Sequence, residues 1–254
     1  MIDSSDEKQR TVLRETLETL WTIEQDFRRS LGDFSAVRAK APDVSSVVDS
    51  ILPDTTKQRQ NELDGTSLAQ LEKLVTACRL CKLEKTRHLV VFGEGNIPAR
   101  VMVVGEGPGA DEDAAGRPFV GKAGQYLDRW LASIQLSRTN GAYIANIVKC
   151  RPPGNRDPES DEIAHCLPYL ERQIELIRPE TILCLGRVSA HTLLNREGTL
   201  QSMRGQWFRY RSVPLLVTYH PSAVLRNPSL RAPVWEDMQR LAAFLHIELP
   251  HKAR

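Results

Sequence analysis

Four of the five cysteines have a spacing that suits metal ligands. Cys78 and Cys81 form a C-x-x-C pair, Cys150 lies in the segment NIVKCRPP, and Cys166 follows on a predicted helix. Two thiolates from a tight turn and two from other segments can close a tetrahedral zinc site or hold an iron–sulfur cluster. The alternative is that all four are buried free thiols. Cys184 lies inside the apolar run TILCLG, which predicts a core residue.

A glycine-rich turn, GEGPGADEDAAGRPFVGKAG, begins at Gly105 and contains an aromatic side chain. Its glycines allow the backbone to turn sharply and to approach a planar ligand closely. It is not a Walker loop, because no G-K-[ST] closes it, and its glycines miss the offset of a dinucleotide-binding turn. Phe119 in this turn can stack on a base; the alternative is that its ring fills the core.

A second loop, YHPSAVLRNPSLRAP, carries a histidine, an apolar side chain and an arginine. Pro221 and Pro228 constrain its path, so we expect Leu225 and Arg226 to project outward. An apolar wedge beside a guanidinium suits a loop that enters stacked bases and holds phosphate. His220 has two interpretations, a catalytic group or a hydrogen-bonded structural residue.

The elements that position these residues alternate between strands and helices after residue 66. Short β-branched runs predict strands, and amphipathic patterns between them predict helices. The strands are expected over 101–105, 142–148, 181–186 and 214–220, and the helices over 124–134, 161–177, 188–195 and 234–245. This alternation predicts an α/β fold, a three-layer α/β/α sandwich around a four-stranded parallel sheet. Gly105, Asn146 and His220 fall at or near the carboxyl ends of these strands, where open parallel sheets bind ligands.

Composition divides the chain near residue 65. Residues 11–31 have the apolar spacing of an amphipathic helix, and the polar composition of residues 35–65 predicts a linker. We therefore expect an N-terminal helical extension over 1–65 and a globular domain over 66–254. The helix either docks on its own domain or contacts a protein partner that the sequence does not identify.

Composition and charge exclude several classes of protein. The chain has 254 residues and a net charge of +2, which excludes a bulk polycation but allows a small basic groove that binds DNA. Its apolar runs are too short to span a membrane, and its first residues, MIDSSDEKQR, are too polar for a signal peptide. We expect a monomer in the cytoplasm, associated with the nucleoid, where cysteines are not paired in disulfides.

Three strings, GEGPGADEDAAGRPFVGKAG, YIANIVKCRPPGNRDP and HPSAVLRNP, with C-x-x-C ahead of them, resemble the family-4 uracil-DNA glycosylases, the iron–sulfur branch of that superfamily. The resemblance runs from about residue 66 to the C-terminus. It implies the uracil-DNA glycosylase fold and a monofunctional enzyme of base excision repair. Such an enzyme flips uracil out of DNA and hydrolyses its N-glycosidic bond, leaving an abasic site. The resemblance also implies a structural 4Fe–4S cluster, with the ligands Cys78, Cys81, Cys150 and Cys166.

The same resemblance implies roles for residues around one pyrimidine. His220 donates to uracil O2, and Asn146 distinguishes uracil from cytosine at N3–H and O4. Phe119 stacks on the pyrimidine ring. Gly107 and Glu112 lie beside uracil C5 and crowd out the methyl group of thymine.

The resemblance leaves other roles open. Other branches place Asp or Asn where this chain has Glu106, so this residue either orients the attacking water or balances the sugar cation. Leu225 fills the gap left by the flipped nucleotide and Arg226 anchors the backbone, or the two exchange these roles. Candidates for phosphate contacts, with solvated surface charges as the alternative, are Lys122, Arg151 and Arg156.

Two other classes of protein fit parts of this pattern: a DNA-binding or polymerase-accessory module without catalysis, and an iron–sulfur redox protein. The joint presence of Phe119, Asn146 and His220 argues against the first. A related branch that traps DNA covalently has a basic, histidine-containing insertion after the first motif. The sequence has none between Phe119 and Asn146, which predicts free turnover.

Overall fold

The structure, a computed structural model, describes residues 54–249. The helix predicted over 11–31, and the predicted linker as far as residue 53, lie outside the described residues. The predicted domain boundary at residue 65 stays a prediction. Between residues 54 and 249, no helix combines the length and the hydropathy that a membrane crossing needs.

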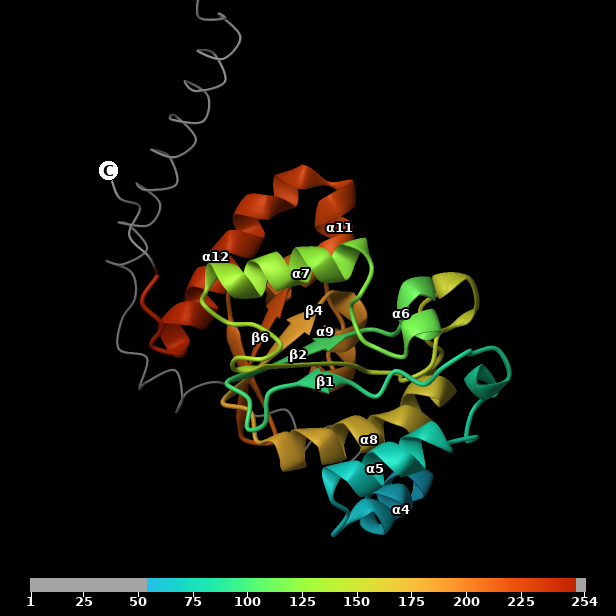
Figure 1. Cartoon of the computed structure of the whole chain (residues 1–254). Helices are drawn as coiled ribbons and strands as arrows, with labels where there is room; N and C mark the ends of the chain where they lie inside the picture. Colours follow the sequence, from blue (N-terminus) through green and yellow to red (C-terminus); the bar gives the residue numbers. More distant parts are fainter. Residues whose placement is uncertain (1–53, 250–254) are drawn as a thin grey trace, which may run out of the picture. The chain divides into compact units, whose positions relative to one another are not determined.

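A six-stranded mixed sheet with the order β1-β3-β2-β4-β6-β5 lies at the centre of the described chain (Figure 1). Four central strands run parallel and confirm the predicted α/β sheet: β3 (Ala142–Asn146), β2 (Val101–Gly105), β4 (Thr181–Leu185) and β6 (Val213–Thr218). Two antiparallel edge strands extend it, β1 (Glu94–Gly95) and β5 (Trp207–Tyr210). The sequence does not predict them, because runs of 2 and 4 residues show too little alternation.

Helices cover both faces of the sheet, as expected for a three-layer sandwich (Figure 1). α7 and α12 lie on one face, and α8 lies on the other, with α4 and α5 packed against it. All residues of β2, β3 and β4 are buried, because strands covered on both faces have no solvent side. The α-helices of the described chain are α4 (Asp54–Leu63), α5 (Leu68–Thr76), α6 (Ala110–Ala115), α7 (Lys122–Ser133), α8 (Ser160–Ile177), α9 (Arg187–Leu194), α10 (Leu200–Met203), α11 (Pro221–Arg226) and α12 (Arg231–Phe244). Short 3-10 helices are η1 (Lys82–Lys85), η2 (Pro153–Asn155) and η3 (Pro228–Leu230).

Helix α4 corrects the linker prediction for its ten residues. Its sequence, DTTKQRQNEL, contains one apolar residue and no apolar stripe, so its pattern does not predict a helix. The helix packs on α8: Leu63 is buried, and the Arg59 guanidinium donates to the Tyr169 hydroxyl at 2.6 Å. The apolar cluster at this contact consists of Leu63, Leu71, Val75, Phe92 and Tyr169.

Candidate active site and cysteine pocket

A pocket opens at the carboxyl ends of the parallel strands and encloses about 1160 Å³, including its open mouth. The ends of β2 and β3 are adjacent, since Gly105 pairs in register with Asn146, and β4 joins β2 to β6. The predicted site residues that line this pocket are Glu106, Gly107, Glu112, Phe119, Asn146, Arg156, His220 and Arg226. Segments far apart in the sequence therefore converge on one cavity.

Asn146, the last residue of β3, presents a buried amide to this pocket. The residue is 1% exposed, and its Oδ1 accepts no hydrogen bond from the described part of the chain. A buried acceptor without a donor costs about 1–3 kcal/mol, which a ligand with an N–H group recovers. A Cβ on Gly105 would lie 2.4 Å from this oxygen and 2.6 Å from the Phe119 ring. Only glycine at this strand end allows the amide and the ring to lie so close.

Phe119 is held in a backbone conformation that L-residues rarely adopt, with φ of 54°. Arg138 fixes this turn: its guanidinium donates to the carbonyls of Pro118 and Phe119, and its Nε donates to Asp128 at 2.8 Å. The Phe119 ring lines the pocket, 5.6 Å from the His220 ring between centroids. The residue is 6% exposed, so its ring belongs both to the core and to the pocket wall.

His220 precedes α11, and its ring is held by Ser222. The main-chain N–H of Ser222 donates to Nδ1 at 3.2 Å, and the Ser222 hydroxyl lies 2.8 Å from the same nitrogen. Because Nδ1 accepts from a main-chain donor, the proton of the neutral ring is on Nε2. Burial, together with the nearby Arg226 charge, lowers the pKa of His220 to about 4. The ring is therefore neutral at pH 7 and offers one N–H donor.

Glu106, directly after β2, lies in the pocket beside a second carboxyl group, that of Asp157. Burial and the negative charge of Asp157 raise the pKa of Glu106 to about 7, while Arg187 acts in the opposite direction. Arg187 also donates a hydrogen bond to Asp157. The sequence alone does not indicate a role for Asp157 or Arg187, because charged residues in loops and first helical turns are usually solvated.

Glu112 and Gly107 shape the turn that borders the pocket. The Glu112 carboxylate accepts from three main-chain N–H groups at 2.9–3.0 Å, those of Gly109, Val120 and Gly121. It thereby joins the two ends of the turn. A Cβ on Gly107 would lie 2.8 Å from a methyl group of Val148, so a larger residue would push the turn away from the segment after β3.

The residues predicted to contact DNA lie at the pocket mouth and beyond it. Arg226 lines the pocket, and its neighbour Leu225 on α11 is 45% exposed. Lys122, at the start of α7, is exposed and lies outside the pocket lining. Arg151 also lies outside the lining, and its Nε donates to Asn155 Oδ1 at 2.8 Å.

Arg156, another predicted phosphate contact, lines the pocket but is already engaged. Its guanidinium donates to the Glu162 carboxylate at 2.8 and 2.6 Å, and the Glu162 side chain is fully buried. This bidentate, charge-assisted pair holds Arg156 against α8. The geometry therefore favours Arg226 over Arg156 as the cation of the pocket mouth.

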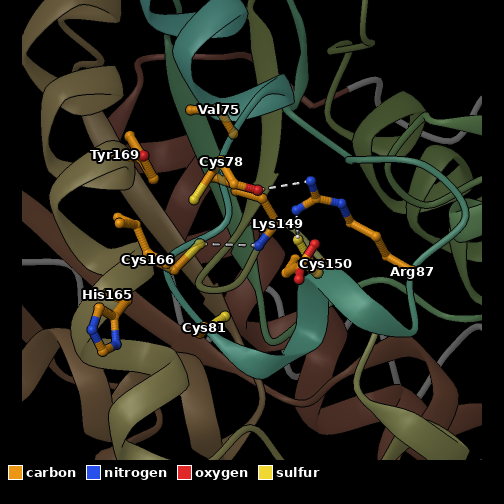
Figure 2. A pocket seen from close by; sticks show the side chains of 11 residues that line it. Val75, Cys78, Cys81, Arg87, Lys149, Cys150, His165, Cys166 and Tyr169 are labelled. Atoms are coloured by element: carbon orange, nitrogen blue, oxygen red, sulfur yellow. Dashed lines mark hydrogen bonds between the residues drawn. The ribbon is translucent and has the colours of Figure 1, made fainter.

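The four predicted metal ligands line a second pocket, of about 310 Å³ (Figure 2). Cys78 and Cys81 come from the turn after α5, Cys150 from the segment after β3, and Cys166 from α8. All four are free thiols in this structure. Cys184 is buried within β4 and lies outside the pocket lining.

Burial and two hydrogen-bond donors determine the electrostatics of this cysteine pocket. Arg87 Nη1 donates to Cys150 Sγ at 3.0 Å, and the main-chain N–H of Lys149 donates to Cys166 Sγ at 3.2 Å. Burial raises the pKa of Cys81, of Cys150 and, to about 12, of Cys166. Because the thiolate is the form that binds a metal, a bound cation would have to displace the protons of these thiols.

The sequence that forms this fold and this pocket matches the pattern of the uracil-DNA glycosylase superfamily. Its family model, described as Uracil DNA glycosylase superfamily, matches residues 92–241. The matched range contains the whole sheet and both loops of the pocket. The chain is therefore a member of the uracil-DNA glycosylase superfamily.

Three type-4 uracil-DNA glycosylases are similar to the chain along most of their own length. The protein of Sulfurisphaera tokodaii is 43% identical over 183 residues, which cover 69% of this chain and 83% of that protein. The protein of Pyrobaculum aerophilum is 44% identical over 179 residues, with coverage of 67% and 91%. The protein of Thermotoga maritima is 41% identical over 180 residues, with coverage of 68% and 92%. The chain belongs to the type-4 uracil-DNA glycosylase family.

Proposed function

We propose that the pocket binds a uracil flipped out of DNA and that the chain hydrolyses its N-glycosidic bond, leaving an abasic site. The activity is that of a uracil-DNA glycosylase, a hydrolase of N-glycosyl bonds in base excision repair. The observation that carries this proposal is the convergence of an amide (Asn146), an imidazole (His220) and a phenyl ring (Phe119) in one cavity. A flipped pyrimidine needs hydrogen bonds at its edge, a donor at the oxygen that gains charge and a stacking surface.

Asn146 recognises the base. Its buried Oδ1 accepts from uracil N3–H, and its amide NH₂ donates to O4. Cytosine has an acceptor at N3 and a donor at C4, so both contacts would be mispaired. Sites built on such hydrogen bonds reject the wrong partner by about 10⁴-fold or more. Gly107 and Glu112 hold the turn that leaves no room for a methyl group at C5.

His220 stabilises the leaving uracil. As the glycosidic bond breaks, negative charge appears on uracil O2, and the Nε2–H of His220 donates to that oxygen. The ring donates in its neutral form, because burial keeps its pKa at about 4. A preorganised donor of this kind contributes about 10²- to 10³-fold to the rate.

Glu106 orients the water that attacks the sugar. The water oxygen forms the new bond to the sugar carbon, and its proton passes to the carboxylate, so Glu106 acts in its ionised form. The ionised carboxylate also balances the positive charge that the sugar develops. Burial, together with the charge of Asp157, raises the pKa of Glu106 to about 7, which makes both proton uptake and release accessible.

Helix α11 opens the duplex and holds it. Leu225 fills the space that the flipped nucleotide leaves, and Arg226 contacts the backbone at the pocket mouth. Lys122 and Arg151 add further phosphate contacts on the surface around the mouth.

The cysteine pocket suits a 4Fe–4S cluster held by Cys78, Cys81, Cys150 and Cys166. Within residues 54–249, no three His, Cys, Asp or Glu side chains are grouped to hold a single metal ion. A zinc ion needs thiolates about 2.3 Å from one centre, whereas a cluster binds each thiolate to a different iron and so accepts wider spacing. When bound, a cluster would cross-link the three segments that carry these cysteines, and it would transfer no electrons in the reaction, because hydrolysis is not a redox reaction.

The proposal is tested by incubating the full chain with a DNA strand that contains one uracil and then treating it with alkali, which cleaves at abasic sites. Strand scission at uracil, and none in matched strands with thymine or cytosine, is the expected result. Binding of the uracil strand without scission would contradict the proposal and favour a DNA-binding module without catalysis.

A further inference from the structure

Lys149 is a buried lysine that lies between the two pockets. It is 1% exposed and lines the cysteine pocket (Figure 2). Its Nζ donates to the main-chain carbonyl of Asn146 at 2.9 Å and to Oε1 of Gln173 at 2.6 Å. Its main-chain N–H donates to Cys166 Sγ at 3.2 Å. One residue therefore contacts a cysteine of the second pocket and the strand end that carries the buried amide of the first.

The ammonium of Lys149 is buried against neutral acceptors, a carbonyl and a side-chain amide. A buried ammonium also needs an anion, since neutral dipoles replace only part of its hydration. The cysteines nearest to Lys149 are Cys166, whose Sγ accepts from its main-chain N–H at 3.2 Å, and Cys150, its neighbour in the sequence. A cluster held by four thiolates carries a net negative charge, because the thiolates outweigh the charge of its core. The cysteine pocket thus supplies the anion that this lysine requires.

We propose that Lys149 is the buried counter-charge of the cluster and that it couples the cluster to the uracil site by holding the carbonyl of Asn146. The inference rests on the proposed 4Fe–4S cluster. Lys149 acts as a positioning residue, because it does not line the uracil pocket. Gln173, on α8, completes the arrangement: its Oε1 accepts from Lys149, and its Nε2 donates to the carbonyl of Phe92 at 2.9 Å.

Two measurable properties follow from this arrangement. A positive charge stabilises the reduced cluster more than the oxidised one, so removal of the ammonium shifts the reduction potential to more negative values. Asn146 also loses a hydrogen bond that fixes its backbone, so inhibition by free uracil weakens by about tenfold. A residue with only a packing role would leave the reduction potential unchanged.

The experiment compares wild-type and Lys149→Met proteins, both full-length and loaded with the cluster, by visible absorption and by electrochemical titration. The Lys149→Met change keeps an unbranched apolar stem and removes the charge. Lys82→Met is the matched control, because Lys82 adjoins Cys81 but its side chain is 49% exposed and pairs with Glu159. The expected result is a negative shift of the reduction potential in Lys149→Met that is absent in Lys82→Met.

Gln173→Glu provides a second variant that keeps Lys149 in place. It introduces a carboxylate at the atom that lies 2.6 Å from Nζ, and we expect it to shift the reduction potential in the same direction. This variant tests the counter-charge even if Lys149→Met does not fold. Colourless wild-type protein with four free thiols overturns the proposed cluster and the inference together. A coloured wild-type protein whose potential is unchanged in both Lys149→Met and Gln173→Glu overturns the inference alone.

Discussion

The main-chain N–H of Ser222 donates to Nδ1 of His220 at 3.2 Å, and this contact determines which ring nitrogen carries the proton. The donor belongs to the backbone and not to the serine hydroxyl, so it survives substitution of the side chain. Because the loop begins with Pro221 and turns directly into α11, the donor is aligned with the ring as soon as the helix forms.

Replacement of His220 by alanine should lower the rate of uracil excision by about 10²- to 10³-fold, because the donor to uracil O2 is lost. Ser222→Ala should keep most of the activity, since the main-chain N–H still fixes the tautomer. Single-turnover excision of uracil from an oligonucleotide measures both. Equal losses in the two variants would show that the hydroxyl, and not the backbone, orients the ring.

The excision rate should rise with pH through about 7, as Glu106 becomes ionised. Asp157 raises the pKa of Glu106 and Arg187 lowers it, so Asp157→Asn should move this rise to lower pH and Arg187→Gln to higher pH. His220 contributes no change in this range, because it is neutral above its pKa of about 4. Single-turnover rates between about pH 5 and 9 test the assignment. Shifts of the same sign in both variants would contradict it.

Asn146→Asp should weaken uracil excision by at least about tenfold and erode discrimination against cytosine. A carboxylate cannot donate to uracil O4, but it accepts from the amino group of cytosine. Asn140→Asp is the control, because it makes the same chemical change at an exposed position before β3. Competition between uracil and cytosine strands gives the ratio of the two rates. Unaltered uracil excision in Asn146→Asp would refute the recognition role.

Leu225→Ala should reduce excision from duplex DNA more than from single strands, because an unpaired nucleotide leaves no stacked gap to fill. Leu74→Ala is the matched control, since Leu74 is exposed to a similar extent, 42% against 45%, and lies on α5 away from the pocket lining. Arg226→Ala should lower the slope of binding against salt by about one. A duplex-to-single-strand ratio that is the same in the wild type and Leu225→Ala would exclude the wedge.

Cys150→Ser should abolish the visible absorption of the cluster and lower both the melting temperature and the soluble yield. The substitution removes one proposed ligand and one of the two hydrogen-bond acceptors of Arg87, while the uracil pocket keeps its own side chains. Cys184→Ala, in the buried strand β4, should keep the absorption. A stable, colourless and fully active Cys150→Ser protein would exclude a structural cluster.

The parallel core of the fold is predictable because β2, β3, β4 and β6 are apolar, β-branched runs separated by helical patterns. The edge strand β1 and the helix α4 are not predictable from the sequence. β1 is too short to show a pattern, and α4 depends on packing against α8. The monomeric state, the cytoplasmic location and the role of the N-terminal extension stay predictions.

The pocket lies at the carboxyl ends of the parallel strands. Asn146 and His220 can be placed in it from the sequence because both lie at or near the ends of predicted strands. Its supporting residues cannot be placed in this way. Lysine is usually found at the surface, so the sequence does not predict that Lys149 is buried. Its burial depends on packing against α8, where Gln173 accepts a hydrogen bond from its Nζ. Arg138 likewise lies in a polar turn, and only the three-dimensional path of the chain brings it to Phe119.

The hydrogen bonds from Arg138 that fix the backbone at Phe119 bear on how quickly a flipped base can bind. The unusual turn is already locked in the free protein, so the aromatic wall is complete before DNA arrives. The entropy of ordering that ring is lost while the chain folds, and not during the brief life of an extrahelical nucleotide. The stacking role proposed for Phe119 therefore predicts that binding of the base is limited by the breathing of the double helix and not by rearrangement of the enzyme.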